Sequence, residues 1–116
     1  MDTPQIKDWH AHVYFDRATR DAAWALRERI EKAFDIEMGR FHEKPVGPHP
    51  MFSYQVHFQP TQFAALIPWL TLNHGDLTVF IHPNTGQDLE DHRDRAVWIG
   101  KSMPLVLSLF TDRKKD

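Results

Sequence analysis

The feature that most constrains the fold of this chain is the alternation of apolar and polar side chains in several short segments. Residues 9–15, 51–58 and 77–82 each alternate with a period of two, which predicts strands with one buried face and one open face. A further short strand is predicted over residues 36–42. Such strands must lie side by side in a sheet whose apolar face is covered by another layer.

Two segments between these strands have the spacing expected of helices that could cover such a sheet. Apolar residues recur at intervals of three and four over residues 18–34, and again from Pro60 to the Asn73-His74-Gly75 cap. This spacing predicts two amphipathic helices. Residues 44–50 contain three prolines and a glycine, which predicts a shaped loop without regular structure.

The order strand, helix, strand, strand, helix, strand predicts an α+β protein with a ferredoxin-like (βαββαβ) antiparallel sheet. Both helices then lie on one face, and the strands take the spatial order fourth, first, third, second. A C-terminal helix over residues 88–98 and a strand over residues 105–110 are expected in addition. At 116 residues, the chain is predicted to form a single domain over residues 1–116.

Histidines are concentrated on the sheet face that the helices leave open; the chain has eight of them. The first strand runs antiparallel to both neighbours, so its beginning meets the ends of the third and fourth strands. His10 and His12 therefore approach His57 and His82. Adjacent strands lie about 4.8 Å apart, which lets imidazoles from three strands reach one metal ion. The same face is predicted to carry Tyr14, Ser53, Gln55, Thr78 and Phe80.

Composition and charge exclude several classes of function. The net charge is −2 with acidic and basic residues mixed along the chain, so no surface for nucleic acid is expected. The longest apolar runs fall short of the ~20 residues that span a bilayer, so no membrane association is expected. The chain has no cysteine, so a transition metal must be held by nitrogen and oxygen. Together with the lack of a secretory apolar segment, this leads us to expect a cytoplasmic protein.

Three short motifs resemble the signatures of a known family. Residues 9–15 (WHAHVYF), residues 46–50 (VGPHP), and residues 82–86 (HPNTG) followed by Asp91-His92 are similar to those of the DOPA 4,5-dioxygenase family. The resemblance covers residues 9 to about 110. It implies an extradiol dioxygenase that cleaves a small aromatic catechol, DOPA-like or a related dihydroxyphenyl compound, with non-haem Fe(II) and O2. It also implies a ferredoxin-like fold that commonly forms a homodimer.

A site with three protein ligands on iron agrees with the open sheet face. We expect His12, His57 and His82 as the ligands, since neutral nitrogen and carboxylate ligands hold iron while leaving positions open. No aspartate or glutamate is predicted on the open face of the first, third or fourth strand. Either histidines alone hold the metal, or a carboxylate such as Asp91 or Glu43 reaches it from a loop or a partner.

The remaining candidate residues surround these ligands. His10 is expected either to replace His12 as a ligand or to orient a ligand. His49, held between two prolines, is the candidate acid–base group, because an ordinary histidine pKa near 6.5 suits removal of a catechol proton. The candidate substrate-binding residues are Asn84, Thr85, Tyr14 and His92.

Two other functions fit the same sequence. One is a cofactor-free small-molecule monooxygenase on the same scaffold, and the other is a non-catalytic dimer that binds a metal or a ligand. Metal content separates the dioxygenase from the monooxygenase, and turnover of a catechol separates it from the binding protein. A single sheet with one helical layer leaves its second face wet, and this also predicts a homodimer.

Overall fold

The structure of the chain is a computed structural model that describes residues 3–114, with side chains through Thr111. Within these residues the chain forms five strands, four α-helices and one 3₁₀ helix. In chain order the elements are β1 (Asp8–Phe15), α1 (Arg20–Ala33), β2 (Glu37–Met38), β3 (Phe52–Phe58), η1 (Pro60–Gln62), α2 (Phe63–Asn73), β4 (Thr78–Asn84), α3 (Asp88–Arg93), β5 (Val97–Ile99) and α4 (Ser108–Lys114).

The strands form one sheet in the order β2-β3-β1-β4-β5, and every neighbouring pair is antiparallel. This confirms the ferredoxin-like α+β architecture and the predicted order of the first four strands, with β5 added beside β4. Strand β1 is central, and its register sets His10 opposite both His57 on β3 and His82 on β4. The sheet therefore brings histidines from three strands to one level.

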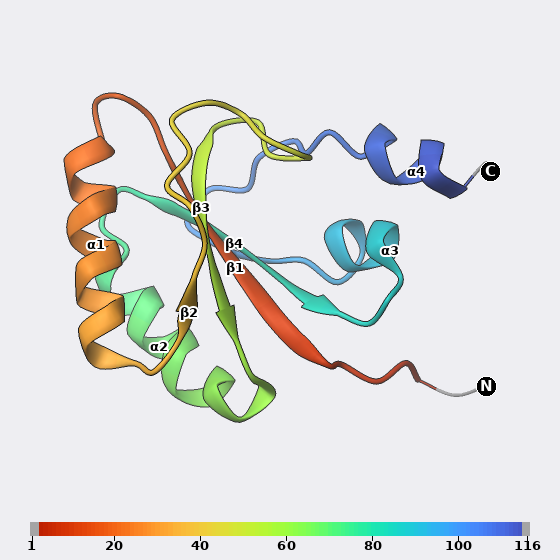
Figure 1. Cartoon of the computed structure of the whole chain (residues 1–116), viewed down its shortest axis with the longest axis horizontal. Coiled ribbons are helices and arrows are strands. Elements are labelled where there is room, and N and C mark those ends of the chain that lie inside the picture. Colours follow the sequence, from red (N-terminus) through yellow and green to blue (C-terminus); the bar gives the residue numbers. More distant parts are fainter. Residues whose placement is uncertain (1–2, 115–116) are drawn as a thin grey trace.

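Helices α1 and α2 lie on the same side of the sheet and bury its apolar face (Figure 1). Each of the three long strands contributes every second residue to this core, as the alternating direction of side chains in a strand requires. The burial of these side chains, at about 25 cal/mol per Å² of apolar surface, drives the packing of the helices on the sheet. The central core residues are Ala11, Val13, Phe15, Ala23, Leu26, Ile30, Tyr54, Val56, Phe58, Leu66, Leu70, Leu77, Val79 and Ile81.

The opposite face carries the polar residues, and the chain itself covers part of it. The C-terminal segment with α3 and α4 lies on this side, away from α1 and α2 (Figure 1). The Val106 N–H donates to the Pro48 carbonyl at 2.9 Å, which joins this segment to the proline-rich loop. His49 of the loop and Phe110 of α4 are both buried. The face predicted to be open and wet is therefore partly closed within one chain.

The predicted C-terminal helix is present but shorter, and the predicted C-terminal strand is absent from residues 105–110. The helix expected over residues 88–98 ends at Arg93, because residues 97–99 pair with β4 as β5. Valine, tryptophan and isoleucine favour strands, and β4 offered them a free edge. The strand expected over residues 105–110 does not form, and helix α4 begins at Ser108 instead. Since β5 already occupies the edge of β4, this segment finds no partner strand there.

The second strand is shorter than predicted. Only Glu37–Met38 pair regularly with β3, followed by an isolated bridge between His42 and Ser53. Between them, the Gly39 N–H donates to the Gln55 carbonyl at 2.8 Å, and a Cβ on Gly39 would lie 3.1 Å from the Gln55 Cβ. Glycine therefore allows this close approach to β3.

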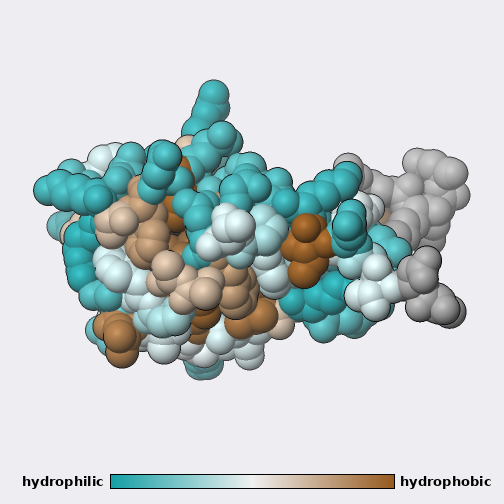
Figure 2. Space-filling view, turned by 90° about the horizontal axis from the view of Figure 1, so that it is seen from below, coloured by the Kyte–Doolittle hydropathy of each residue, from teal (hydrophilic) through white to brown (hydrophobic). Residues whose placement is uncertain are grey.

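The surface is mixed in polarity. Figure 2 shows the molecule from below, where hydrophilic and apolar residues are interspersed and one apolar patch lies toward the end that carries α3 and α4. Among the described residues, no helix is long and apolar enough to cross a bilayer. The large apolar side chains that remain exposed are Ile6, Trp24, Leu72, Val97, Val106 and Leu109.

Candidate metal centre

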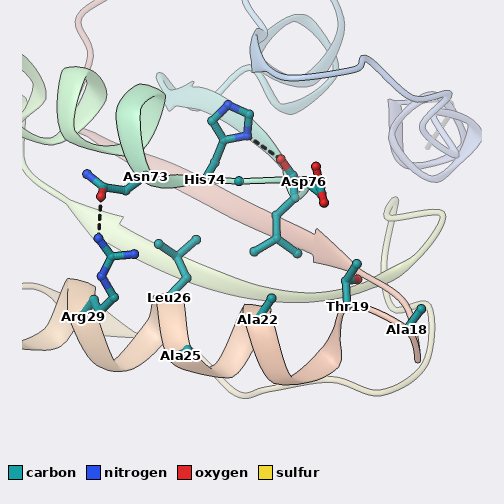
Figure 3. Close-up of a pocket in the computed structure, with 11 residues that line it drawn as sticks. Ala18, Thr19, Ala22, Ala25, Leu26, Arg29, Asn73, His74 and Asp76 are labelled. Atoms are coloured by element: carbon teal, nitrogen blue, oxygen red, sulfur yellow. Dashed lines mark hydrogen bonds between the residues drawn. The ribbon is translucent and has the colours of Figure 1, made fainter.

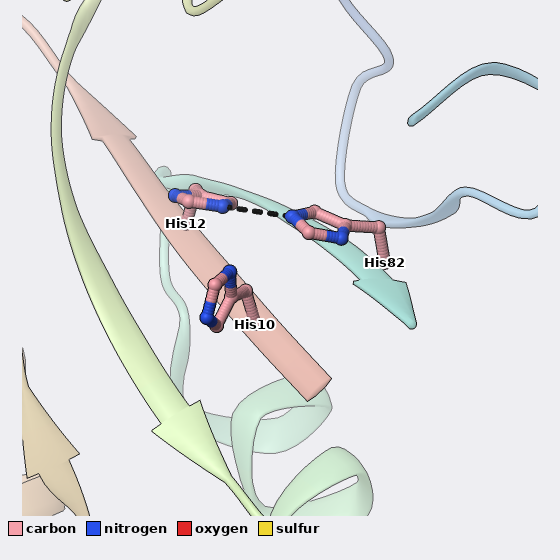
Figure 4. Close-up of side chains that lie close together, drawn as sticks. All are labelled: His10, His12 and His82. Carbon is pink, nitrogen blue, oxygen red and sulfur yellow. Dashed lines mark hydrogen bonds between the residues drawn. The ribbon is translucent and has the colours of Figure 1, made fainter. Parts of the chain in front are cut away.

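Three histidines from β1 and β4 converge on the polar face of the sheet. The rings of His12 on β1 and His82 on β4 face each other, and His10 lies beside them on β1 (Figure 4). One ring nitrogen from each of the three lies within 4.8 Å of the others. Ligands on a common ion at bonds of roughly 2.1 Å lie about 3–4 Å apart, so small ring rotations suffice to bring all three onto one metal. Among the described residues, this is the one cluster of metal-ligating groups.

Backbone contacts prepare His82 as a ligand. Its Nδ1 lies 2.9 Å from the Pro83 carbonyl, which can only accept, so Nδ1–H is the donor. The lone pair of neutral His82 is therefore on Nε2, which lies 3.2 Å from Nε2 of His12. A hydrogen bond that fixes the tautomer of a histidine in this way is typical of metal-binding imidazoles.

Burial keeps the imidazoles of the cluster neutral. Desolvation lowers the pKa of His82 to about 3 and holds the pKa of His12 well below its usual range. The pKa of His10 is also lowered, by desolvation and then by the charge of His57. Neutral imidazole is the form that binds a metal ion. At pH 7 the metal therefore does not have to displace a proton from a charged imidazolium ring. Three neutral nitrogens, two of them on buried histidines, therefore fit an ion such as iron, zinc or copper.

The cluster opens into a cavity of about 320 Å³ between the sheet and the C-terminal segment. His92 of α3 stacks on His82 with ring centroids 3.9 Å apart, and Phe110 of α4 packs on His92 at 4.4 Å. An aromatic wall therefore faces the histidines. The cavity is lined by His10, His12, Pro48, His49, Gln55, His82, Asn84, Asp88, His92, Leu109 and Phe110.

His57, one of the three predicted ligands, lies outside this cluster. Its Nε2–H donates to Asp8 Oδ2 at 2.8 Å, and its Nδ1 lies 3.5 Å from a carboxylate oxygen of Glu37. The hydrogen bond with Asp8 raises the pKa of His57. His10 takes the place of His57 beside His12 and His82. It was expected either to replace His12 as a ligand or to orient a ligand.

The expectation that no carboxylate lies on the polar face of these strands is wrong. Strand β1 begins at Asp8, one residue earlier than predicted, and Asp8 lies on the same face as His10. Its second oxygen, Oδ1, accepts a hydrogen bond from Asn84 Nδ2 at 2.7 Å. Desolvation acts to raise the pKa of Asp8, but the bonds from His57 and Asn84 outweigh it and lower the pKa. The period of two, extended by one residue, would have found this carboxylate.

The two loop carboxylates considered as ligands have other partners. Glu43 is exposed and binds Arg20, with Nη2 and Oε1 2.9 Å apart. Asp91 is buried, and its two oxygens accept the Thr85 N–H at 2.8 Å and an Arg95 N–H at 3.0 Å. The Thr85 hydroxyl also donates to Asp91 at 2.9 Å. Asp91 therefore holds the turn after β4 in place.

Replacing Asp91 with alanine should destabilise the fold. The change leaves the Thr85 N–H and the Arg95 guanidinium without their buried acceptor, and we expect a loss of about 2–3 kcal/mol in the free energy of unfolding. Urea denaturation measures this. Asp94→Ala is the matched control, because Asp94 is an exposed partner of Arg93 and should cost less than ~0.5 kcal/mol. Equal effects in the two variants would contradict the structural role of Asp91.

The candidate substrate-binding and acid–base residues are divided between the cavity and its surroundings. His49, Asn84 and His92 line the cavity. Thr85 instead lines a separate apolar cavity of about 280 Å³ beside the N-terminal segment. Tyr14 is buried behind His49, and its hydroxyl lies 2.7 Å from His49 Nδ1. The structure thus brings three of these residues to the histidines and holds Thr85 and Tyr14 apart from the cavity.

A further cavity, of about 450 Å³, lies on the other side of the sheet between α1 and the turn that follows α2 (Figure 3). Its helical wall consists mainly of small side chains, including Ala22 and Ala25. Its polar groups bond within the protein: Arg29 donates to Asn73, and His74 Nδ1 donates to the Leu77 carbonyl. This cavity holds no group of metal ligands among the described residues.

Fold and site together define a small α+β protein with three converging histidines beside a cavity, and known proteins share this chain's sequence and fold. A "DOPA 4,5-dioxygenase" from Amanita muscaria is 37% identical over 113 residues, which are 90% of this chain and 50% of that protein. An "uncharacterized 21.2 kDa protein" from Botryotinia fuckeliana is 44% identical in an alignment of 116 positions, which covers 90% of this chain and 63% of that protein. The crystal structure of a "putative dioxygenase" from Nostoc punctiforme matches with a TM-score of 0.91 and 42% identity, covering 93% of this chain and 94% of that chain.

Residues 9–109 match the Dopa 4,5-dioxygenase family. The chain therefore belongs to this family, as the three sequence motifs suggested. It spans half to two thirds of the length of the two fungal relatives, 50% and 63% respectively.

Proposed function

We propose that this protein is an iron-dependent extradiol dioxygenase that cleaves the ring of a catechol, with His10, His12 and His82 as the metal ligands. The observation that carries the proposal is the convergence of these three neutral imidazoles at one end of a cavity. Family membership supports the oxygenase class, and the Amanita muscaria relative is named for the cleavage of DOPA. His57 is left out of the ligand set because its Nε2–H is donated to Asp8.

His10, His12 and His82 would hold Fe(II) through three nitrogens and would leave positions open for both hydroxyl oxygens of a catechol and for dioxygen. The cavity volume of about 320 Å³ suits a single aromatic ring with a short side chain. His92 and Phe110, whose rings are tilted by 32° against each other, form an aromatic wall against which such a ring can pack. His49 and Asn84 offer polar atoms to the substrate from the other sides.

The reaction inserts both atoms of O2 into one organic product. The ring bond that breaks joins one hydroxyl-bearing carbon to the neighbouring carbon without a hydroxyl, and a muconic semialdehyde forms. The protein contributes orientation of the ring, exclusion of water and placement of protons. His12 and His82 are buried, which limits the access of water to their rings.

Anaerobic loading with Fe(II), followed by a panel of catechols and then oxygen, tests the function. We expect one O2 consumed for each yellow semialdehyde formed. A protein that binds iron but consumes no oxygen with any catechol would favour the non-catalytic binding protein. Turnover that survives complete removal of iron by a chelator would favour the cofactor-free monooxygenase.

We further propose that the protein forms a homodimer. The polar face is partly covered by the chain itself, so the proposal rests on apolar side chains that stay exposed on and around the C-terminal segment: Val97 (37%), Val106 (51%) and Leu109 (41%). Burial of such side chains against a second copy is favourable. Sedimentation at micromolar concentration should give about twice 13.7 kDa, and a single 13.7 kDa species would contradict the dimer.

A further inference from the structure

Tyr14 and His49 form a buried hydrogen-bonded pair, and the proposed reaction gives Tyr14 no role. The Tyr14 hydroxyl lies 2.7 Å from His49 Nδ1, and only 1% and 7% of the two residues are exposed. The Tyr14 ring is held by Trp98 and Phe80, with ring centroids at 6.1 and 6.3 Å. The His49 N–H donates to the Val46 carbonyl at 3.1 Å, which holds the loop. Both partners are therefore fixed in position.

The direction of this hydrogen bond follows from what each group needs. A hydroxyl carries one proton, and His49 Nδ1 is the one hydrogen-bond partner of the Tyr14 hydroxyl among the described residues. If Nδ1 carried the proton, the buried Tyr14 O–H would have no acceptor, which disfavours that arrangement about tenfold or more. If Tyr14 donates, both groups are satisfied. The proton of neutral His49 is then on Nε2.

Nε2 of His49 is available to a ligand. It has no hydrogen-bond partner among the described residues. If it were also buried, it would be an unsatisfied buried atom, but Arg27 Nη1 is the one such atom among the described residues. The atom is therefore accessible. His49 lines the cavity, and its ring lies 4.2 Å from that of His12 between centroids. His49 also lines a smaller cavity of about 170 Å³ beside the proline-rich loop. Its free nitrogen is thus open to a ligand beside the proposed metal ligands.

We propose that Tyr14 is a positioning residue that fixes His49 in the Nε2–H tautomer, so that His49 presents a hydrogen-bond donor to the bound ligand. The proposal rests on the proposed function for the identity of that ligand, but the tautomer itself follows from the two side chains alone.

The tautomer decides what His49 can do in the reaction. A neutral imidazole with its proton on Nε2 donates to a ligand oxygen and cannot accept a proton at that atom. Its basic nitrogen, Nδ1, is occupied by the Tyr14 hydroxyl. His49 therefore stabilises negative charge on a catechol or product oxygen as a donor or acid. The removal of a catechol proton, for which the sequence suggested His49, falls to another group.

Nitrogen-15 NMR of the iron-free protein at pH 7.5 tests this directly, because long-range proton–nitrogen correlations show which ring nitrogen carries the proton. His49→Gln assigns the signals by removing them. We expect His49 to have its proton on Nε2 in at least about nine-tenths of the molecules, as a tenfold preference requires. A proton on Nδ1 in the unaltered protein would overturn the proposal, whatever the variants do.

Tyr14→Phe and Tyr54→Phe form a matched pair of variants. Each removes one buried tyrosine hydroxyl from the sheet, but the Tyr54 hydroxyl donates to the Ala23 carbonyl on the helical side. We expect Tyr14→Phe to bring the two His49 tautomers to comparable populations, while Tyr54→Phe leaves the Nε2–H form dominant. An unchanged tautomer in folded Tyr14→Phe would contradict the positioning role. Because no iron or substrate is present, a protein inactive on catechols would refute the proposed function and leave this result standing.

Discussion

His82→Ala should purify with almost no iron and show no ring cleavage at any pH. The variant removes one of three ring nitrogens that lie within 4.8 Å of one another. It also removes the histidine whose tautomer the Pro83 carbonyl fixes. Changing even a partner of a ligand costs 10–100-fold in metal affinity, so loss of the ligand itself should cost more than about 100-fold. Metal analysis after anaerobic Fe(II) loading, with an oxygen-electrode assay on the same sample, measures both effects. His12→Ala should behave in the same way.

His57→Ala and His74→Ala provide the contrast. His57 is bound to Asp8 outside the cluster, and His74 bonds the Leu77 carbonyl on the helical side of the sheet. Both variants should keep their iron. Iron lost from His57→Ala but retained by His10→Ala would restore His57 to the ligand set and remove His10 from it.

Acidification should strongly destabilise the iron-free protein. Burial lowers the pKa of His49 to about 4 and the pKa of His82 to about 3, from an ordinary value of 6.5. Between these values the unfolded chain binds more protons than the folded chain, so the free energy of unfolding falls as the pH decreases. The loss begins near pH 6.5 and continues to about pH 3. At about 1.4 kcal/mol per pKa unit, the combined loss is on the order of 8 kcal/mol.

The imidazole of His57 limits this pH profile on the alkaline side. The raised pKa of His57 acts in the opposite direction, since its stabilising contribution is present below pH 6.5 and lost as the pH rises through the folded pKa. Between pH 8 and pH 4, the urea concentration at the midpoint of unfolding should therefore decrease mainly below pH 6.5. His82→Gln should flatten that acid slope. A midpoint that does not change between pH 7 and pH 4.5 would show that these imidazoles are already solvated.

The fold could be predicted because side-chain alternation fixes which face of a strand each residue occupies. Ala11 and Val13 are buried in the core, whereas His10 and His12 face the cavity. A slip of one residue would exchange the two sets, so the hydrophobic pattern excludes such a slip. Three of the histidines expected to converge do so for this reason.

The choice among the histidines could not be predicted, because it depends on partners outside the pattern. His57 lies directly opposite His10 in the register, but Asp8 draws its ring toward the end of the sheet. Likewise, Thr85 follows the strand-end motif but its hydroxyl is engaged by buried Asp91. Register places a side chain on a face, and the neighbouring acceptors then decide where its polar atoms point.

The cover over the site was missed because its signal is weak in the sequence. Residues 105–110 are apolar and short, and such runs do not distinguish strand from helix. In the structure, Phe110 of α4 is buried against His92, and Val106 bonds the proline-rich loop. Only the tertiary contacts show that this segment closes the cavity of its own chain.

The location of bound iron tests the central claim most directly. Crystals loaded anaerobically with Fe(II) can be measured on both sides of the iron absorption edge, and the anomalous difference then marks the metal. We expect one peak, bonded to ring nitrogens of His10, His12 and His82 at roughly 2.1 Å. A peak held instead by His57 and Asp8, or no peak at a concentration of iron that supports turnover, would contradict the three-histidine centre.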